Sequence, residues 1–174
     1  MKNVGQARLR ESWSGQRATE PPPLPLGPEY WRERRLAAGF ALAGCAVFAV
    51  AAVLDPYDPS GLPRSHGTHR QLGLPACSLK MLTGFGCPSC GMTTTFSLLM
   101  HGDPVAAWHT NWAGCVIAGL ALLGTAWFLA IAVGLPPGRF TCDEVLKVTT
   151  FMGLGLAMVR WLTHLGYAAF VAVF

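Results

Sequence analysis

Charge is scarce in this chain of 174 residues. Asp, Glu, Lys and Arg make up 13% of it, against roughly a quarter in an ordinary soluble domain, while hydrophobic residues make up 52%. Of the 13 Lys and Arg residues, 7 lie in the first 35 positions, and no basic face continues beyond them. These deficits exclude a large soluble enzyme core, argue against nucleic-acid binding and favour a membrane protein with one domain.

Residues 1–35 contain too few apolar side chains to build a core. Their polar composition and the proline-rich stretch at residues 21–25 predict a disordered tail. The prolines are typical of a solvated tail, and a docking ligand for a partner domain is the alternative. The basic residues place the tail, and so the N-terminus, in the cytoplasm by the positive-inside rule.

Three uncharged or nearly uncharged stretches follow, at residues 36–54, 112–135 and 148–174. The first has 19 residues, which as a helix cover about 28 Å, close to the thickness of the hydrocarbon core. Only Arg160 and His164 interrupt the third stretch. The sequence therefore predicts an all-α membrane protein with three transmembrane helices, in which residues 36–174 form a single membrane domain and residues 55–111 a loop outside.

Residues 81–100 are also mostly apolar, but Gly84, Gly86, Pro88 and Gly91 interrupt the first half. These residues oppose a continuous helix, so only residues 92–101, about 15 Å long, are predicted to be helical. We expect a re-entrant or interfacial half-helix that follows the turn at Pro88. A fourth full crossing is the alternative, and it would move every later loop to the other side.

The six cysteines differ in their surroundings. Cys45 and Cys115 lie in predicted spans, where a free thiol behaves as a small hydrophobic side chain, and a loop residue, Cys142, has no partner nearby in the sequence. The other three share the segment that glycine and proline interrupt: Cys77, Cys87 and Cys90.

Three kinds of chemistry suit this cluster. The Cys87-Pro-Ser-Cys90 spacing is found in zinc sites, where Cys77 would be a third ligand and His69 or His101 a fourth. A structural disulfide is expected if the loop faces an oxidising compartment. A thiol–disulfide oxidoreductase would use Cys87 as the attacking thiol and Cys90 as the resolving thiol, favoured by a helix N-terminus nearby, but no thioredoxin-like pattern surrounds the pair.

Arg160 and His164 lie one helical turn apart inside the third predicted span. A charge at this depth costs at least about 2.5 kcal/mol, so Arg160 should face protein or water. One hypothesis is an anion or proton site that faces the Cys87–Cys90 loop. The other, which the need to satisfy polar groups favours, is a structural arginine that binds exposed carbonyl groups of the interrupted segment.

Four short strings carry a family resemblance. They are Gly67-Thr-His69, Gln71-Leu-Gly-Leu-Pro-x-Cys77, Leu82-Thr-Gly84 and Cys87-Pro-Ser-Cys-Gly-Met-Thr-Thr94. Together they resemble the family DUF2752, small bacterial membrane proteins with a Cys-Pro-x-Cys-Gly-x-Thr signature, over about residues 65–130. Gly102-Asp103 and Asn111 also fit. Many members have Arg where this chain has Thr94, and Pro where it has Trp112. The resemblance implies the bacterial inner membrane and supplies no activity.

The sequence thus predicts an integral membrane protein organised around the Cys-Pro-Ser-Cys-Gly turn, with a structural or metal-binding role favoured over an enzymatic one. Zinc is the candidate metal, and the lipid bilayer is the expected partner. The alternatives are the oxidoreductase and an accessory subunit of a membrane complex, which would pack small residues of the 112–135 span, such as Gly114 and Ala118, against another membrane protein. The sequence does not name a substrate.

Overall fold

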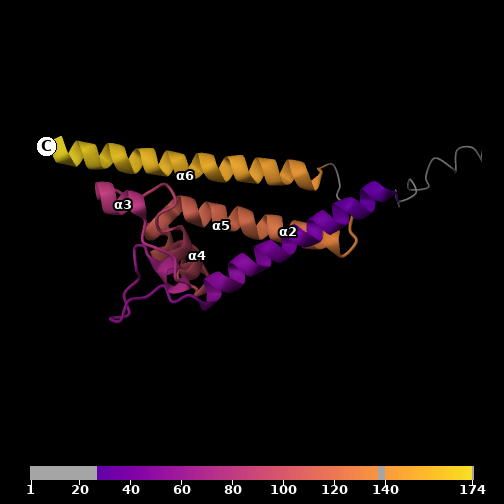
Figure 1. The fold of residues 1–174 in the computed structure, drawn as a ribbon, viewed down its shortest axis with the longest axis horizontal. Coiled ribbons are helices and arrows are strands. Elements are labelled where there is room, and N and C mark those ends of the chain that lie inside the picture. Colours follow the sequence, from indigo (N-terminus) through magenta and orange to yellow (C-terminus); the bar gives the residue numbers. More distant parts are fainter. Residues whose placement is uncertain (1–26, 137–139, 174) are drawn as a thin grey trace, which may run out of the picture. The chain divides into compact units, whose positions relative to one another are not determined.

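The computed structural model describes residues 27–136 and 140–173, and Figure 1 gives the element labels used from here on. The chain divides into two compact units, Met1–Trp31 and Arg32–Phe174. Of the first unit only residues 27–31 are described, so the proline-rich stretch and most of the predicted tail lie outside the described residues. The contacts below are those of the second unit.

Three long helices dominate the fold and confirm the predicted class. They are α2 (Pro28–Val53), α5 (Pro104–Ala132) and α6 (Cys142–Val173), and each is long and apolar enough to cross a membrane. The described residues contain no β-strand beyond an isolated bridge between Tyr57 and Pro63.

The helices begin earlier than the apolar stretches that predicted them. α2 starts at Pro28, not at residue 36, because proline suits the first position of a helix and the charged residues that follow do not stop helix propagation. α5 starts at Pro104, with Asp103 accepting a hydrogen bond from the Ala106 N–H at 3.0 Å. The helix is interrupted at Asn111, whose φ of −159° and ψ of 94° are non-helical, so the predicted start at residue 112 marks its second half.

Most large apolar side chains of these helices are exposed. Leu42 and Val53 of α2, Leu123 of α5 and Phe151 of α6 are between 69% and 85% exposed. A soluble monomer rarely shows contiguous apolar surface of this extent, whereas a lipid-facing helix does. The fold is therefore that of a membrane protein in contact with the bilayer.

α2 and α5 pack closely through small residues. The buried core joins Ala37 and Ala41 of α2 to Phe128 and Ile131 of α5. Further along α2, a Cβ atom on Gly44 would lie 2.1 Å from Thr125 Oγ1. Glycine is thus required at this crossing, as in other close helix pairs within membranes.

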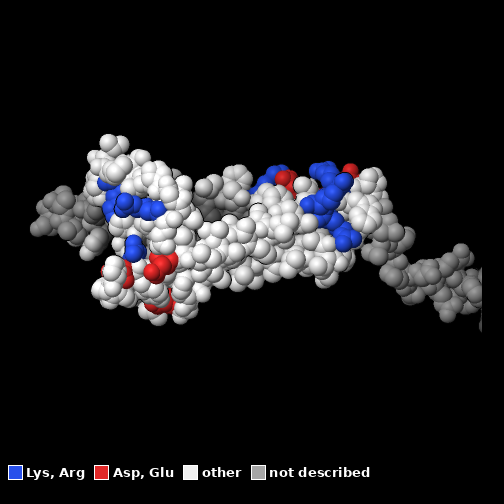
Figure 2. All heavy atoms as spheres, turned by 60° about the horizontal axis from the view of Figure 1, so that its bottom comes forward, with Lys and Arg blue, Asp and Glu red and all other residues white. Residues whose placement is uncertain are grey.

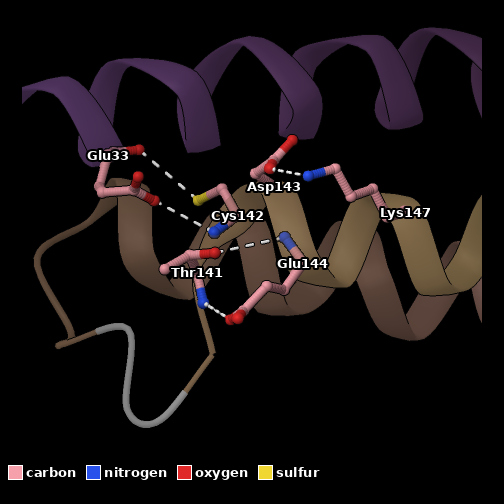
Figure 3. A network of polar contacts seen from close by, with 6 residues as sticks. All are labelled: Glu33, Thr141, Cys142, Asp143, Glu144 and Lys147. Carbon is pink, nitrogen blue, oxygen red and sulfur yellow. Dashed lines mark hydrogen bonds and ion pairs between the residues drawn. The ribbon is translucent and has the colours of Figure 1, made fainter.

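The start of α6 is held by a polar network (Figure 3). The Glu33 carboxylate accepts a hydrogen bond from the Cys142 N–H at 3.1 Å, and the Thr141 and Glu144 side chains each accept a bond from the other residue's backbone N–H. This reciprocal pair is a capping box. Arg34 donates to the Ala132 carbonyl at the end of α5, at 2.9 Å.

The segment between α2 and α5 is folded as short pieces, of which the half-helix at residues 92–101 was predicted. It contains η2 (Thr68–Leu72), α3 (Ser78–Thr83) and α4 (Met92–Met100). α4 has nine residues, about 13 Å, or roughly half of the hydrocarbon thickness. It packs against α5 and η2.

Charged side chains on the face drawn in Figure 2 gather in two groups and leave the surface between them white. Arg32, Arg34 and Arg35 lie at the start of α2, whereas Arg64, Arg70 and Lys80 lie in the segment between α2 and α5. This pattern is typical of a protein with a lipid-facing belt between two polar ends.

Candidate metal centre

Cys87 and Cys90 are placed by a tight turn. The Cys90 N–H donates to the Cys87 carbonyl at 3.0 Å, and Pro88 occupies the second position, for which its fixed φ is suited. The turn leads into α4 through Gly91, whose φ of 84° is left-handed and where a Cβ atom would lie 3.1 Å from the Ser65 carbonyl oxygen. Glycine is required here for both conformation and space.

Cys77 lies immediately before α3 and reaches the same place. The Sγ atoms of Cys77, Cys87 and Cys90 all lie within 4.8 Å of one another. The Cys87 and Cys90 sulfurs are 3.3 Å apart, and the Cys87 N–H donates to Cys90 Sγ at 3.1 Å. That separation is a thiol contact and not a disulfide, whose sulfurs lie about 2.05 Å apart.

The three thiols differ in acidity. A hydrogen bond from the Lys80 backbone N–H, supported by the thiols of Cys90 and Cys87, lowers the pKa of Cys77 from 9.0 to about 7. Burial, followed by the hydrogen bonds with Cys87 and Cys77, raises the pKa of Cys90 to about 12. Cys77, which directly precedes α3, is therefore the thiol of the cluster that most readily becomes negatively charged.

The structure separates the two histidines that the sequence offered as a fourth ligand. His69, on η2, lines the same cavity of about 980 Å³ as the three cysteines, but its ring is not within 4.8 Å of all three sulfurs, and Nε2 lies 3.2 Å from the Pro75 carbonyl oxygen. His101 follows α4, at the opposite end of that helix from Cys90, and contacts the Ser97 carbonyl. The suggestion of His101 was wrong, because α4 holds it about 13 Å away.

Asn111 connects the turn to α5. Its side-chain Oδ1 accepts the Gly114 N–H at 2.9 Å, and its Nδ2 donates to the Cys90 carbonyl at 3.3 Å. In a regular helix the Gly114 N–H would bind the carbonyl of Thr110, so the interruption at Asn111 frees that carbonyl. The freed Thr110 carbonyl accepts a hydrogen bond from Arg160 at 3.0 Å.

Two neighbouring residues of α6 contact the region around the cysteine turn. Beside Arg160, the indole N–H of Trp161 donates to the Gly86 carbonyl at 2.9 Å. His164, one turn further along, lines the same cavity as Arg160, Cys87 and Cys90. The carbonyl that Arg160 binds belongs to α5, whereas the sequence predicted one from the interrupted segment. The role of Arg160, structural or anion-binding, stays a prediction.

The remaining cysteines do not join the cluster. Cys45 is exposed on α2, Cys115 lies within α5, and Cys142 is buried at the start of α6. Trp161 and Asn111 are the site residues that the reasoning from sequence missed in these roles. The signals available were a tryptophan in a span and an asparagine before an apolar run, which also fits the family pattern.

Fold and site together define a membrane protein with three spanning-length helices and a thiol cluster in the interrupted segment between the first two. Residues 77–125 match the model of the family described as "Protein of unknown function (DUF2752)", which confirms the resemblance carried by the cysteine motif. The matched segment contains all three clustered cysteines and the greater part of α5. No curated protein and no solved structure matches the chain.

Proposed function

We propose that Cys77, Cys87 and Cys90 bind a thiophilic metal ion, with zinc as the best fit, at one polar end of this membrane protein. The observation that carries the proposal is the approach of the three sulfur atoms to within 4.8 Å of one another. Sulfurs that share one tetrahedral zinc ion at about 2.3 Å lie about 3.8 Å apart. Small side-chain movements would therefore bring the cluster to coordination geometry.

Positively charged side chains surround the cluster. Lys80, His66, His69, Arg64 and Arg70 line the same cavity as the three sulfurs, and no Asp or Glu is among the described lining residues. Positive neighbours stabilise thiolate, which is the form that binds metal. Three sulfurs leave the fourth position of a tetrahedral ion to a residue of the cavity wall, with His69 as the candidate, or to solvent.

The second candidate function is thiol–disulfide exchange. The 3.3 Å contact between the Cys87 and Cys90 sulfurs supports it, because formation of their disulfide needs only a small movement. In that reaction the two thiols would give two electrons and two protons to the disulfide of a partner protein, which becomes a dithiol. The thiol with the lowered pKa is Cys77, whereas the pKa of Cys90 is raised. Exchange through Cys87 and Cys90 alone would give Cys77 no role.

Metal content of the purified full chain separates the two functions. The protein, solubilised without chelator and loaded with zinc, is expected to retain about one zinc ion per chain after gel filtration. Cys77→Ser and Cys87→Ser should lose it, whereas Cys45→Ser, which removes an exposed thiol outside the cluster, should retain it. A wild-type chain that retains no metal, but reversibly forms the Cys87–Cys90 disulfide, would reject the metal site in favour of exchange.

The positions of the two polar ends relative to the membrane are part of this proposal. Arg32, Arg34 and Arg35 at the start of α2 support a cytoplasmic N-terminus, which places the cysteine cluster on the outer side of the inner membrane of a bacterial cell. A membrane-impermeant maleimide added to intact spheroplasts is then expected to label Cys77. Labelling that occurs only after lysis would reverse the orientation.

A further inference from the structure

Beside the cysteine turn lies a second cavity, of about 380 Å³, whose polar lining is unusual. Lys80, Arg160, His66, His109 and His164 contribute to its wall, and none of its described lining residues is Asp or Glu. These basic groups come from the loop before η2, from α3, from α5 and from α6. The fold thus gathers basic side chains that lie far apart in the sequence around one cavity.

Arg160 is the charge that most needs a counter-ion. It is half-buried on a helix long and apolar enough to cross a membrane, and its described hydrogen bond, to the Thr110 carbonyl, uses one of five N–H donors. The ion pair described on α6, between Lys147 and Asp143, lies near the start of the helix and does not involve Arg160. A cation in apolar surroundings without a carboxylate partner is costly, and a bound anion would offset that cost.

Lys80 faces the same cavity from α3 and also lacks a carboxylate among the described residues. Its ammonium group lies 2.5 Å from His66 Nε2, which must accept the hydrogen bond and is therefore neutral. Burial first, and then the charge of Lys80, lowers the pKa of His66 from 6.5 and keeps the ring in this form. Lys80 is thus a second positive charge at this cavity, and its described contacts, both to the His66 ring, leave at least one of its three N–H donors for a ligand.

We propose that this cavity binds an oxyanion, a phosphate or carboxylate group, held by Arg160 and Lys80 next to the Cys87–Cys90 turn. Arginine and lysine are the side chains that bind such groups most strongly, through charge-assisted hydrogen bonds. His109 and His164 make no hydrogen bond to another described residue and supply further donors at the cavity wall. The oxyanion is either a soluble anion or the headgroup of an anionic lipid, because α6 brings Arg160 to the site from within a spanning helix.

Thermal unfolding of the detergent-solubilised full chain tests the site, with inorganic phosphate as the probe at constant ionic strength. Phosphate should raise the melting temperature of the wild type, and Arg160→Gln and Lys80→Gln should weaken the apparent affinity about tenfold or more, as expected for loss of a charged hydrogen bond. The matched control is Arg34→Gln, which removes another arginine bound to a helix carbonyl, at 2.9 Å, and should keep the phosphate response.

The lipid source is tested by native mass spectrometry of protein purified from membranes that contain phosphatidylglycerol. Retention of this lipid by the wild type and by Arg34→Gln, but not by Arg160→Gln or Lys80→Gln, identifies a headgroup as the ligand. If Arg160→Gln does not fold, Lys80→Gln, on the short exposed helix α3, is used alone for the phosphate and the lipid measurements. A wild type that responds to neither probe, or variants that respond as the wild type does, would overturn the proposal. Cys77→Ser keeps the anion response, so the failure of the metal site and of the anion site are distinguishable.

Discussion

At the end where α2 and α6 begin, polar groups are paired within the protein, whereas at the end that carries the cysteines several of them face cavities. At the first end Glu33 and the Thr141–Glu144 capping box bind the N-terminal N–H groups of α6, and Arg34 binds the end of α5. At the second end the sulfurs, Lys80 and Arg160 line open space. Internal hydrogen bonds therefore stabilise the first end, whereas thiol and charged groups of the second end are accessible from cavities.

The same contrast appears in the helices. α2 and α5 are joined by a close crossing at Gly44 and by a small apolar core. Beyond that crossing, α5 is interrupted at Asn111, and the chain before it is folded into η2, α3 and α4. Interrupted helices expose backbone groups that must be satisfied by other parts of the protein. Here they are satisfied by Asn111, Arg160 and Trp161, which also build the site.

The largest effect that the contrast predicts is a difference in thiol reactivity. In metal-free, reduced protein at pH 7, about half of Cys77 and a negligible fraction of Cys90 is thiolate. Iodoacetamide should therefore modify Cys77 at least about 100-fold faster than Cys90, as followed by mass spectrometry of peptides. The Cys77 rate should rise with pH, be half-maximal near pH 7 and level off about one pH unit higher, while the Cys90 rate still increases at pH 10. Faster modification of Cys90 would contradict the assigned acidities.

Asn111→Ala should lower the free energy of unfolding by about 2–4 kcal/mol, because it removes a helix cap and leaves the Cys90 carbonyl without its donor. Denaturation of the detergent-solubilised protein measures this loss. Asn111→Asp keeps the acceptor for the Gly114 N–H and lacks the donor to Cys90, so an intermediate loss is expected. Equal stability of wild type and Asn111→Ala would show that the interruption of α5 is not held by this side chain.

Gly44→Ala tests the crossing that separates the two ends. A Cβ atom there would meet Thr125 Oγ1 at 2.1 Å, and overpacking of this kind costs about 1–3 kcal/mol. Gly39→Ala is the matched control on the same helix, since a Cβ atom at Gly39 has nothing within 4 Å and alanine favours a helix by up to about 1 kcal/mol. Opposite shifts in melting temperature are expected, and a destabilised Gly39→Ala with an unaffected Gly44→Ala would place the crossing elsewhere.

Glu33→Ala should have a small effect, a loss of about 1 kcal/mol, because it removes one carboxylate acceptor from the start of α6. Asp143→Ala, which removes an exposed carboxylate paired with Lys147 only, should cost less than half of that. Neither variant should change metal content or phosphate response. A change in metal content or in phosphate response would show that the start of α6 influences the cysteine end, and so contradict the separation of the two ends.

Reasoning from the sequence predicted the parts of the fold that depend on local pattern. The three spans follow from long apolar stretches, and the short helix α4 follows from the glycines and the proline before it. Helix starts were misplaced because charged residues end an apolar stretch without ending a helix, as at Arg32–Arg35 in α2. His101 could have been excluded from the cluster at that stage, because the predicted half-helix already separated it from Cys90.

The contacts of α6 could not be predicted in the same way. Arg160 binds a carbonyl 50 residues earlier and Trp161 one 75 residues earlier, and both depend on how α6 packs against α5. The Thr110 carbonyl is available only because Asn111 takes the Gly114 N–H, a local event with no strong sequence signal. The same packing gathers Lys80 and Arg160, which in the sequence are scattered charges, around one cavity.

X-ray absorption at the zinc K-edge of the zinc-loaded full chain tests the central claim most directly. We expect a first coordination shell of three sulfur atoms at about 2.3 Å and one nitrogen or oxygen atom at about 2.0 Å, and no such sulfur shell in Cys77→Ser, which should not retain the ion. A shell composed of nitrogen and oxygen alone, or one unchanged by Cys77→Ser, would contradict a metal centre at Cys77, Cys87 and Cys90.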